Sequence, residues 1–280
     1  MSPYIPSYST STDGLLLQHD LDRLQGWSVK WGLILNPIKC KSFTMTLRRA
    51  PVQTQYHIDN VNLEFVDEIR DLGTILDSKL TFSANISTIV SRANRALGLL
   101  IRTFQTNSKR TKFNQKSLLT AYYANIRSLL EYNSVIWSGA ANSHTVRVDR
   151  VQHKFLIWLN HHVTRHCDSL AYESLLNHFG VISLSSRRLQ HDLLFLKGLF
   201  SNKIKSTELL EKFALHVPAR LTRTLLLFAE RRGRVSTVSN SFPQRIPREV
   251  NVFLRQRNVD FFNDSFSSFR SHVLAYVRTV

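Results

Sequence analysis

Apolar residues recur at the spacing of a helix over long stretches of the chain. The longest such stripe follows Ala84 and spans about five turns, because spacings of three and four place residues on one helical face. Its members are Ile86, Ile89, Val90, Ala93, Leu97, Leu100, Ile101 and Phe104. Similar periods predict two further helices, over residues 115–130 and 145–159. Residues 84–165 are therefore expected to form a three-helix bundle.

The first eighty residues combine helical and strand patterns. Residues 1–12 hold two prolines and no apolar period, which predicts a disordered leader. Thr12 or Asp13 can cap a helix that ends at Gly32 and buries one stripe, made of Leu17, Leu21, Leu24 and Trp31. Short strands are expected over residues 33–35, 43–47 and 69–76, and Asp59-Asn60 predicts a hairpin turn. Residues 13–83 thus form a small α+β part.

The remaining chain, residues 166–280, is expected to be helical. Apolar periods predict helices over residues 170–178, 184–200 and 207–213. Pro243 and Pro247 are expected to break the chain, and the phenylalanines that follow suggest a closing helix or two. The predicted fold class is mainly α with a small α+β N-terminal part.

The net charge of the chain predicts what kind of partner it binds. The 37 basic and 20 acidic residues give a net charge of +17, and such an excess favours a polyanion, with nucleic acid as the leading candidate. On the helix after Ala84, three arginines fall within roughly 80° of one another at 100° per residue, and this basic ridge runs into three further cations. The ridge consists of Arg92, Arg95 and Arg102, followed by Lys109, Arg110 and Lys112. It is either a solvated face or a phosphate contact surface, and the lack of acids between Asp77 and Glu131 favours phosphate contact.

Other classes of protein find less support. Cys40 and Cys167 are too few for a disulfide framework, and no signal peptide or membrane-spanning apolar run is present, so an intracellular protein of the nucleus or cytoplasm is expected. His161, His162, His166 and Cys167 lie close together, but one thiolate is few for structural zinc, so no metal site is expected.

Several ordered blocks carry a family resemblance. They are LLLQHDL at 15–21, WSVKWGL at 27–33, LNPIKCK at 35–41, DLGTILD at 71–77, LEYNSVIWS at 130–138, VQHKF at 151–155, and scattered residues from Arg188 to Phe262. Together they resemble the end of the palm, the thumb and the C-terminal region of LINE-type, non-LTR retrotransposon reverse transcriptases of the jockey-like kind. The resemblance implies a palm remnant over 13–83, a thumb-like bundle over 84–165 and a helical C-terminal region over 166–280.

The resemblance also suggests roles for a few residues. Lys39 matches the position of a lysine thought to protonate the leaving pyrophosphate, and the alternative is a solvated lysine after a turn. Leu72, Gly73 and Thr74 match the primer-gripping turn, and a plain strand turn is an equal alternative.

The catalytic carboxylates of the family are not found in this sequence. Polymerases hold two metal ions with carboxylates, and the family uses two adjacent aspartates, whereas this chain has no Asp-Asp pair. Asp20 and Asp22 would point roughly 200° apart on the predicted helix. The chain alone is therefore expected to be inactive, with no catalytic residue and no cofactor, Mg²⁺ being expected only in the complete polymerase.

The sequence leaves three hypotheses about function. The first is a reverse-transcriptase fragment that binds RNA or an RNA/DNA template–primer. The second is a decayed or domesticated element-derived protein that acts as a structural or protein-interaction module. The third is a fragment that becomes active with a fingers–palm portion supplied by another polypeptide.

Overall fold

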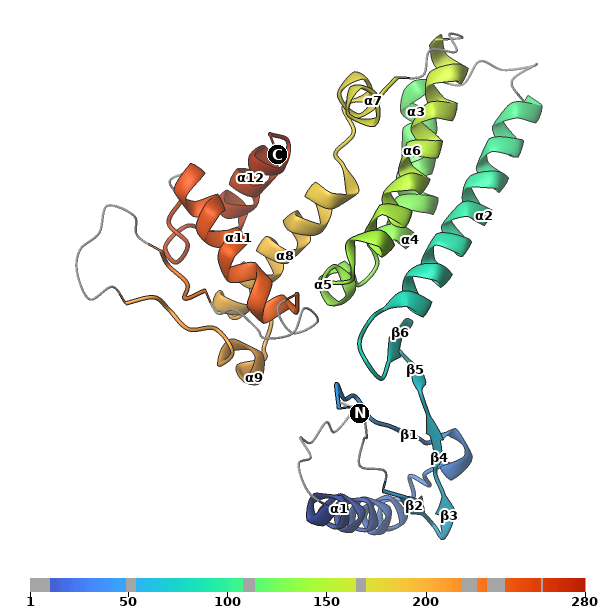
Figure 1. Cartoon of the computed structure of the whole chain (residues 1–280), viewed down its shortest axis with the longest axis vertical. Coiled ribbons are helices and arrows are strands. Elements are labelled where there is room, and N and C mark those ends of the chain that lie inside the picture. Colours follow the sequence, from blue (N-terminus) through green and yellow to red (C-terminus); the bar gives the residue numbers. More distant parts are fainter. Residues whose placement is uncertain are drawn as a thin grey trace. The chain divides into compact units, whose positions relative to one another are not determined.

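The computed structural model describes residues 11–48, 54–107, 114–164, 170–217, 226–230, 240–257 and 259–279. The chain divides into two compact units, Met1–Thr81 and Phe82–Val280. Helices dominate, and short strands occur in the first unit, so the predicted fold class is confirmed (Figure 1). The predicted leader falls largely outside the described residues.

In the first unit, helix α1 (Ser11–Lys30) holds a small hairpin through two glutamines. The hairpin pairs β2 (His57–Ile58) with β3 (Val61–Asn62), and both turn residues have positive φ, as the sequence predicts: 52° at Asp59 and 58° at Asn60. The Gln18 side chain exchanges two hydrogen bonds of 3.0 Å with the backbone of His57. Two turns further along the same helix face, Gln25 Oε1 accepts a hydrogen bond from the Asp59 N–H at 2.9 Å.

The other strands of this unit are short. Strand β1 (Lys41–Phe43) pairs in parallel with β4 (Glu64–Val66), and β5 (Glu68–Asp71) pairs with antiparallel β6 (Thr74–Asp77). Three strand predictions therefore need correction. Residues 33–35 form no strand and lead instead into a 3-10 helix, η1 (Pro37–Lys39), which the Asn36 side chain caps. The second strand, β1, shares only Phe43 with the expected 43–47, and the expected single strand over 69–76 is a hairpin.

The first unit buries few apolar side chains. Among the apolar side chains described in this unit, only those of Ile58 and Leu63 are buried. The expected stripe on α1 is half-buried at Leu17, Leu21 and Leu24, and the prediction is wrong for Trp31, which lies beyond the helix end and is 65% exposed.

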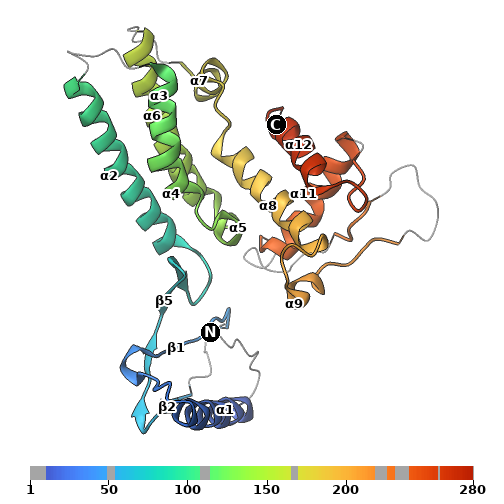
Figure 2. The same cartoon turned by 180° about the vertical axis from the view of Figure 1, so that it is seen from behind.

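The second unit begins with the expected bundle, seen from two sides in Figure 1 and Figure 2. Helix α2 (Ser83–Asn107) packs against α6 (Asn142–Thr164). The middle helix, expected over 115–130, consists of α3 (Gln115–Tyr122), a π-helical turn η2 (Tyr123–Arg127) and α4 (Ser128–Glu131), and short α5 (Ser134–Trp137) leads to α6. The α2 stripe is confirmed, since Ile86, Ala93 and Leu97 are at most 4% exposed.

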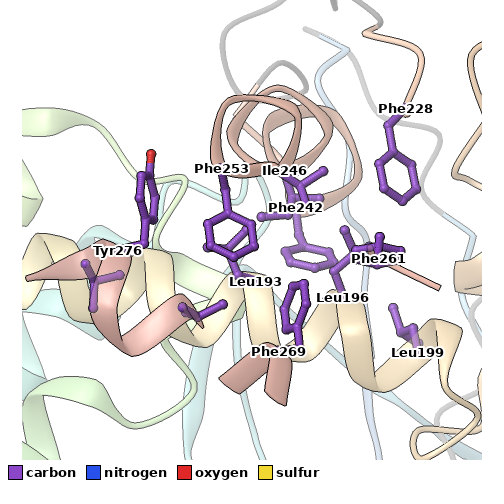
Figure 3. Close-up of a cluster of buried hydrophobic side chains, with 13 residues drawn as sticks. Leu193, Leu196, Leu199, Phe228, Phe242, Ile246, Phe253, Phe261, Phe269 and Tyr276 are labelled. Carbon is purple, nitrogen blue, oxygen red and sulfur yellow. The ribbon is translucent and has the colours of Figure 1, made fainter. Parts of the chain in front are cut away.

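Helix α8 (Leu184–Phe200) joins this bundle to the rest of the unit. Before it comes α7 (Tyr172–Phe179) and after it α9 (Thr207–Leu210), so the helices expected over 170–178, 184–200 and 207–213 are confirmed within a few residues. Leu193, Leu196 and Leu199 of α8 are buried in an apolar cluster with residues of the last two helices (Figure 3).

The last two helices are α11 (Phe242–Arg257) and α12 (Phe266–Val277). The expected break at Pro243 and Pro247 is wrong, because both prolines lie inside α11. Pro243 is in the first turn, where backbone N–H groups have no intrahelical acceptor. Pro247 removes one hydrogen bond further on, and burial of its helix face, with Ile246 and Val250, holds the helix together.

The bundle buries one tyrosine hydroxyl, that of Tyr122, without a hydrogen-bond partner among the described residues. The Tyr122 ring stacks on that of Phe155, with ring centroids 4.2 Å apart. An unsatisfied buried polar group costs about 1–3 kcal/mol. We therefore expect Tyr122→Phe, which keeps the ring, to leave the free energy of unfolding in urea unchanged or raise it by up to about 1 kcal/mol.

Tyr172 provides the matched control, because its Oη donates to Gln152 Oε1 at 2.8 Å. Tyr172→Phe should lower the free energy of unfolding by about 1 kcal/mol. A comparable loss in Tyr122→Phe would contradict the assignment of its hydroxyl as unsatisfied.

Candidate nucleic-acid interface

Helix α2 presents three arginines to solvent. Arg92, Arg95 and Arg102 are all exposed, on the side opposite the buried stripe. Neither Arg92 nor Arg95 takes part in an ion pair with any other described residue. The predicted continuation of the ridge, Lys109, Arg110 and Lys112, lies outside the described residues. The three arginines therefore share an exposed helix face, and their contact with phosphate stays a prediction.

Helix α6 contributes three further cations, which were not among the predicted nucleic-acid-binding residues. Arg147 Nη1 donates to Ser87 Oγ of α2 at 3.1 Å, which ties the two helices side by side near their N-terminal ends. Arg150 and Lys154 follow on exposed positions. Spacings of three and four from Arg147 to Arg150 to Lys154 were the available signal, since they place these side chains on one face. The α2 and α6 surfaces together are named here the basic face: Arg92, Arg95, Arg102, Arg147, Arg150 and Lys154.

Few acids oppose this face. Residues 82–164 contain eleven Lys or Arg residues and two acids, Glu131 and Asp149. Both acids pair with arginines of α8. Arg187 donates two hydrogen bonds of 2.7 Å to the Glu131 carboxylate, and Arg188 Nη1 donates to Asp149 Oδ1 at 3.2 Å. The carboxylates that would weaken the positive potential of the bundle are thus already neutralised.

Glu131 also contacts a histidine. His191 Nε2 lies 3.7 Å from Glu131 Oε2, and its Nδ1 lies 3.0 Å from Ser134 Oγ. The same three residue types form hydrolytic relays. Ser134 is only 2% exposed, however, so a substrate cannot reach its hydroxyl. The cluster holds α8 against α4 and α5.

The hairpin tip expected to resemble a primer-gripping turn is well formed. Leu72 and Gly73 have φ of 43° and 86°, so they form a two-residue turn between β5 and β6 that favours glycine at the second position. The Leu72 side chain is 81% exposed, whereas Thr74 is 4% exposed and begins β6. This geometry fits both alternatives for the turn, and primer contact stays a prediction.

The other candidate residues, Lys39, Asp20 and Asp22, belong to the first unit. Lys39 is an exposed residue at the end of η1, a position that leaves both alternatives for it open. Asp20 lies 3.8 Å from Arg23, and Asp22 accepts a hydrogen bond from Gln18. Both aspartates are thus engaged along α1.

The described residues offer neither a metal site nor a membrane span. No group of three or more His, Cys, Asp or Glu residues suited to a metal ion occurs within the described ranges, and His166 and Cys167 lie outside them. The absence of a zinc site therefore stays a prediction. Among the helices described, none has the length and apolar character needed to cross a bilayer.

Comparisons with known proteins support the resemblance that the sequence carries. The chain is 30% identical over 146 residues to the RNA-directed DNA polymerase from mobile element jockey of Drosophila funebris. It is 28% identical over 132 residues to the probable RNA-directed DNA polymerase from transposon X-element, and 27% identical over 145 residues to that from transposon BS, both of Drosophila melanogaster. Its homologues are reverse transcriptases of non-LTR retrotransposons.

These matches cover part of each protein. They span 47% to 50% of this chain and 14% to 15% of the length of the reverse transcriptases. No family model matches the chain, and no solved structure matches it.

The histidine beside Glu131 predicts a pH effect on stability. Burial lowers the pKa of His191, neighbouring Arg187 and Arg127 lower it further, and Glu131 opposes them. A histidine with a lowered pKa binds its proton more readily in the unfolded chain. Its stabilising contribution is therefore present above the ordinary imidazole pKa of about 6.5 and is lost as the pH falls through the folded-state pKa.

We expect the free energy of unfolding to fall between pH 7 and pH 5 more steeply in the wild type than in His191→Asn, both followed by urea denaturation. Burial raises the pKa of Asp192 to about 6, and this acts in the opposite direction in both proteins, so the comparison cancels it. His178→Asn at an exposed position of α7 is the control and should keep the wild-type slope. Equal slopes in wild type and His191→Asn would refute the expectation.

Proposed function

We propose that the chain is a fragment of a non-LTR retrotransposon reverse transcriptase that binds RNA or an RNA/DNA template–primer through the basic face. The observation that carries this proposal is the exposed arginine ridge of α2 in a segment without acids, from Ser78 to Leu130. Three outward cations on one helix face can follow a phosphate backbone, and such contacts recognise charge and not base sequence. In this assignment the bundle serves as the thumb.

Binding through phosphate predicts a strong dependence on salt. Each phosphate neutralised contributes roughly 0.7–0.9 to the slope of log affinity against log salt. Replacing Arg92, Arg95 and Arg102 together with alanine should weaken binding to an RNA/DNA duplex and reduce that slope by about 2–3. Fluorescence anisotropy at several salt concentrations measures both quantities.

A second triple variant separates this surface from net charge. Arg248, Arg255 and Arg270 are exposed on α11 and α12, so their replacement by alanine changes the net charge equally. This control should keep most of the wild-type slope. If both triple variants behave alike, net charge alone explains binding and the assignment to the basic face is wrong.

The exposed apolar side chains of the first unit suggest that it also binds a protein partner. It holds 13 of the 23 exposed large hydrophobic residues of the described chain, among them Trp27, Trp31 and Ile34. Its β1–β4 pair is a parallel two-stranded sheet, whereas parallel sheets occur almost only with both faces covered. The occupant proposed for this apolar surface is the rest of such a polymerase, because the matched segments account for 14% to 15% of the relatives. A domesticated protein-interaction module remains the alternative.

The chain alone is expected to incorporate no nucleotide on a template–primer with Mg²⁺, because no adjacent aspartates are present to hold two metal ions. Mixed with the unmatched portion of the jockey polymerase, it should form a complex detectable by sedimentation. Trp27→Asp with Trp31→Asp should abolish that complex, whereas Tyr132→Asp with Ile136→Asp, at similarly exposed positions of the bundle, should not. Incorporation by the chain alone would contradict its proposed inactivity, and an unaffected complex would contradict the apolar surface as its docking site.

A further inference from the structure

A small polar pocket lies where three segments of the second unit meet. They are the connection from α5 to α6, the polar side of α8, and the N-terminal end of α11. The pocket has a volume of about 280 Å³, which is near the lower limit of ligand sites, roughly 300 Å³. It is lined by Ser138, Gly139, Ala140, Asn142, Thr145, Arg188, Asn240 and Arg245. We propose that this pocket binds a phosphate group.

The charged lining of the pocket is positive. Two guanidinium groups, of Arg188 and Arg245, line it, and no carboxylate does. Arg245 is already engaged by protein acceptors, since it donates to the Asp192 carboxylate, Ser138 Oγ and the backbone carbonyls of Val135 and Asn240. It therefore shapes the wall of the pocket.

Arg188 is the group with donors to spare. The residue is 8% exposed, and the described residues offer its guanidinium one hydrogen bond, from Nη1 to Asp149. A guanidinium has five N–H donors, and buried donors are nearly always satisfied. A phosphate has several charged acceptor oxygens and pairs with arginine through two parallel hydrogen bonds.

The beginning of α6 adds to this positive lining. Asn142 and Thr145 come from the first turn of this 23-residue helix, whose N-terminal end attracts anions. The wall beside them is close-packed, because a Cβ on Gly139 would lie 2.1 Å from the Asn240 carbonyl oxygen. The glycine thus allows the loop before α6 to approach the start of α11.

The test uses inorganic phosphate and the full chain. Phosphate should raise the thermal unfolding midpoint more than chloride at equal ionic strength, and isothermal titration should give a saturable signal. Arg188→Gln combined with Asp149→Asn leaves no unpaired carboxylate and should weaken phosphate binding by at least about tenfold. Asn142→Ala, at an exposed position, should weaken it by a smaller factor, and Arg255→Gln, at an exposed position of α11 outside the pocket and the basic face, should leave it unchanged.

The source of the phosphate group is settled by competition. A dinucleoside monophosphate should displace inorganic phosphate if the pocket takes a backbone phosphate, and should not if it takes a free phosphate; either result supports the site. No stabilisation specific to phosphate, or equal binding by the wild type and both pocket variants, would overturn the proposal. This outcome does not depend on the basic face, so the two proposals can fail separately.

Discussion

The electrostatics of the bundle depend on how α8 binds two carboxylates. Glu131 and Asp149 are the acids of residues 82–164, and neighbouring arginines of α8, Arg187 and Arg188, pair with them. Burying an ion pair yields little net stability, but removing one partner leaves a charge that costs about 3–5 kcal/mol. The pairs therefore act mainly to fix α8 in place, and among the described residues of the bundle no acid is left over to pair with Arg92 or Arg95 of α2.

Helix α8 also joins the bundle to the last two helices of the second unit. Its apolar residues, Leu193, Leu196 and Leu199, are buried with the phenylalanines of α11 and α12. Its polar side carries Asp192, which accepts hydrogen bonds from Arg245 of α11, while Arg245 also reaches the carbonyl of Val135 in α5. Because one helix takes part in both the apolar cluster and the ion pairs, the bundle and the last helices form one compact unit.

Long periodic segments could be predicted from the sequence, and contacts between distant residues could not. The α2 stripe and its exposed arginines follow from spacing alone, and the bounds of α8 agree with the predicted ones. Strands of two to four residues are too short to show a period, which explains the errors at residues 33–35 and 69–76. The helix through Pro247 exists because its face is buried, a tertiary effect that local propensity does not contain.

In the candidate site, too, features within one helix could be predicted and contacts between distant residues could not. The arginine ridge was visible because its members share one helix, whereas the contribution of α6 depends on the contact between Arg147 and Ser87, sixty positions apart. Glu131 pairs with Arg187, fifty-six positions away in the sequence. Sequence spacing therefore could not show that the negative charge of Glu131 is neutralised in the fold. The pocket beside Arg188 combines three segments far apart in the sequence, and no local pattern marks it.

The partners proposed for the two units differ for one physical reason. The second unit buries its own apolar side chains, so its exposed surface is free to be charged, and the cations of the bundle suit a polyanion. The first unit buries two, and such a small core cannot offset the conformational entropy of some seventy ordered residues. The proposed protein partner would supply the apolar contacts that this unit lacks. The proposed nucleic-acid binding and the proposed protein binding then belong to different units, so evidence for one does not count against the other.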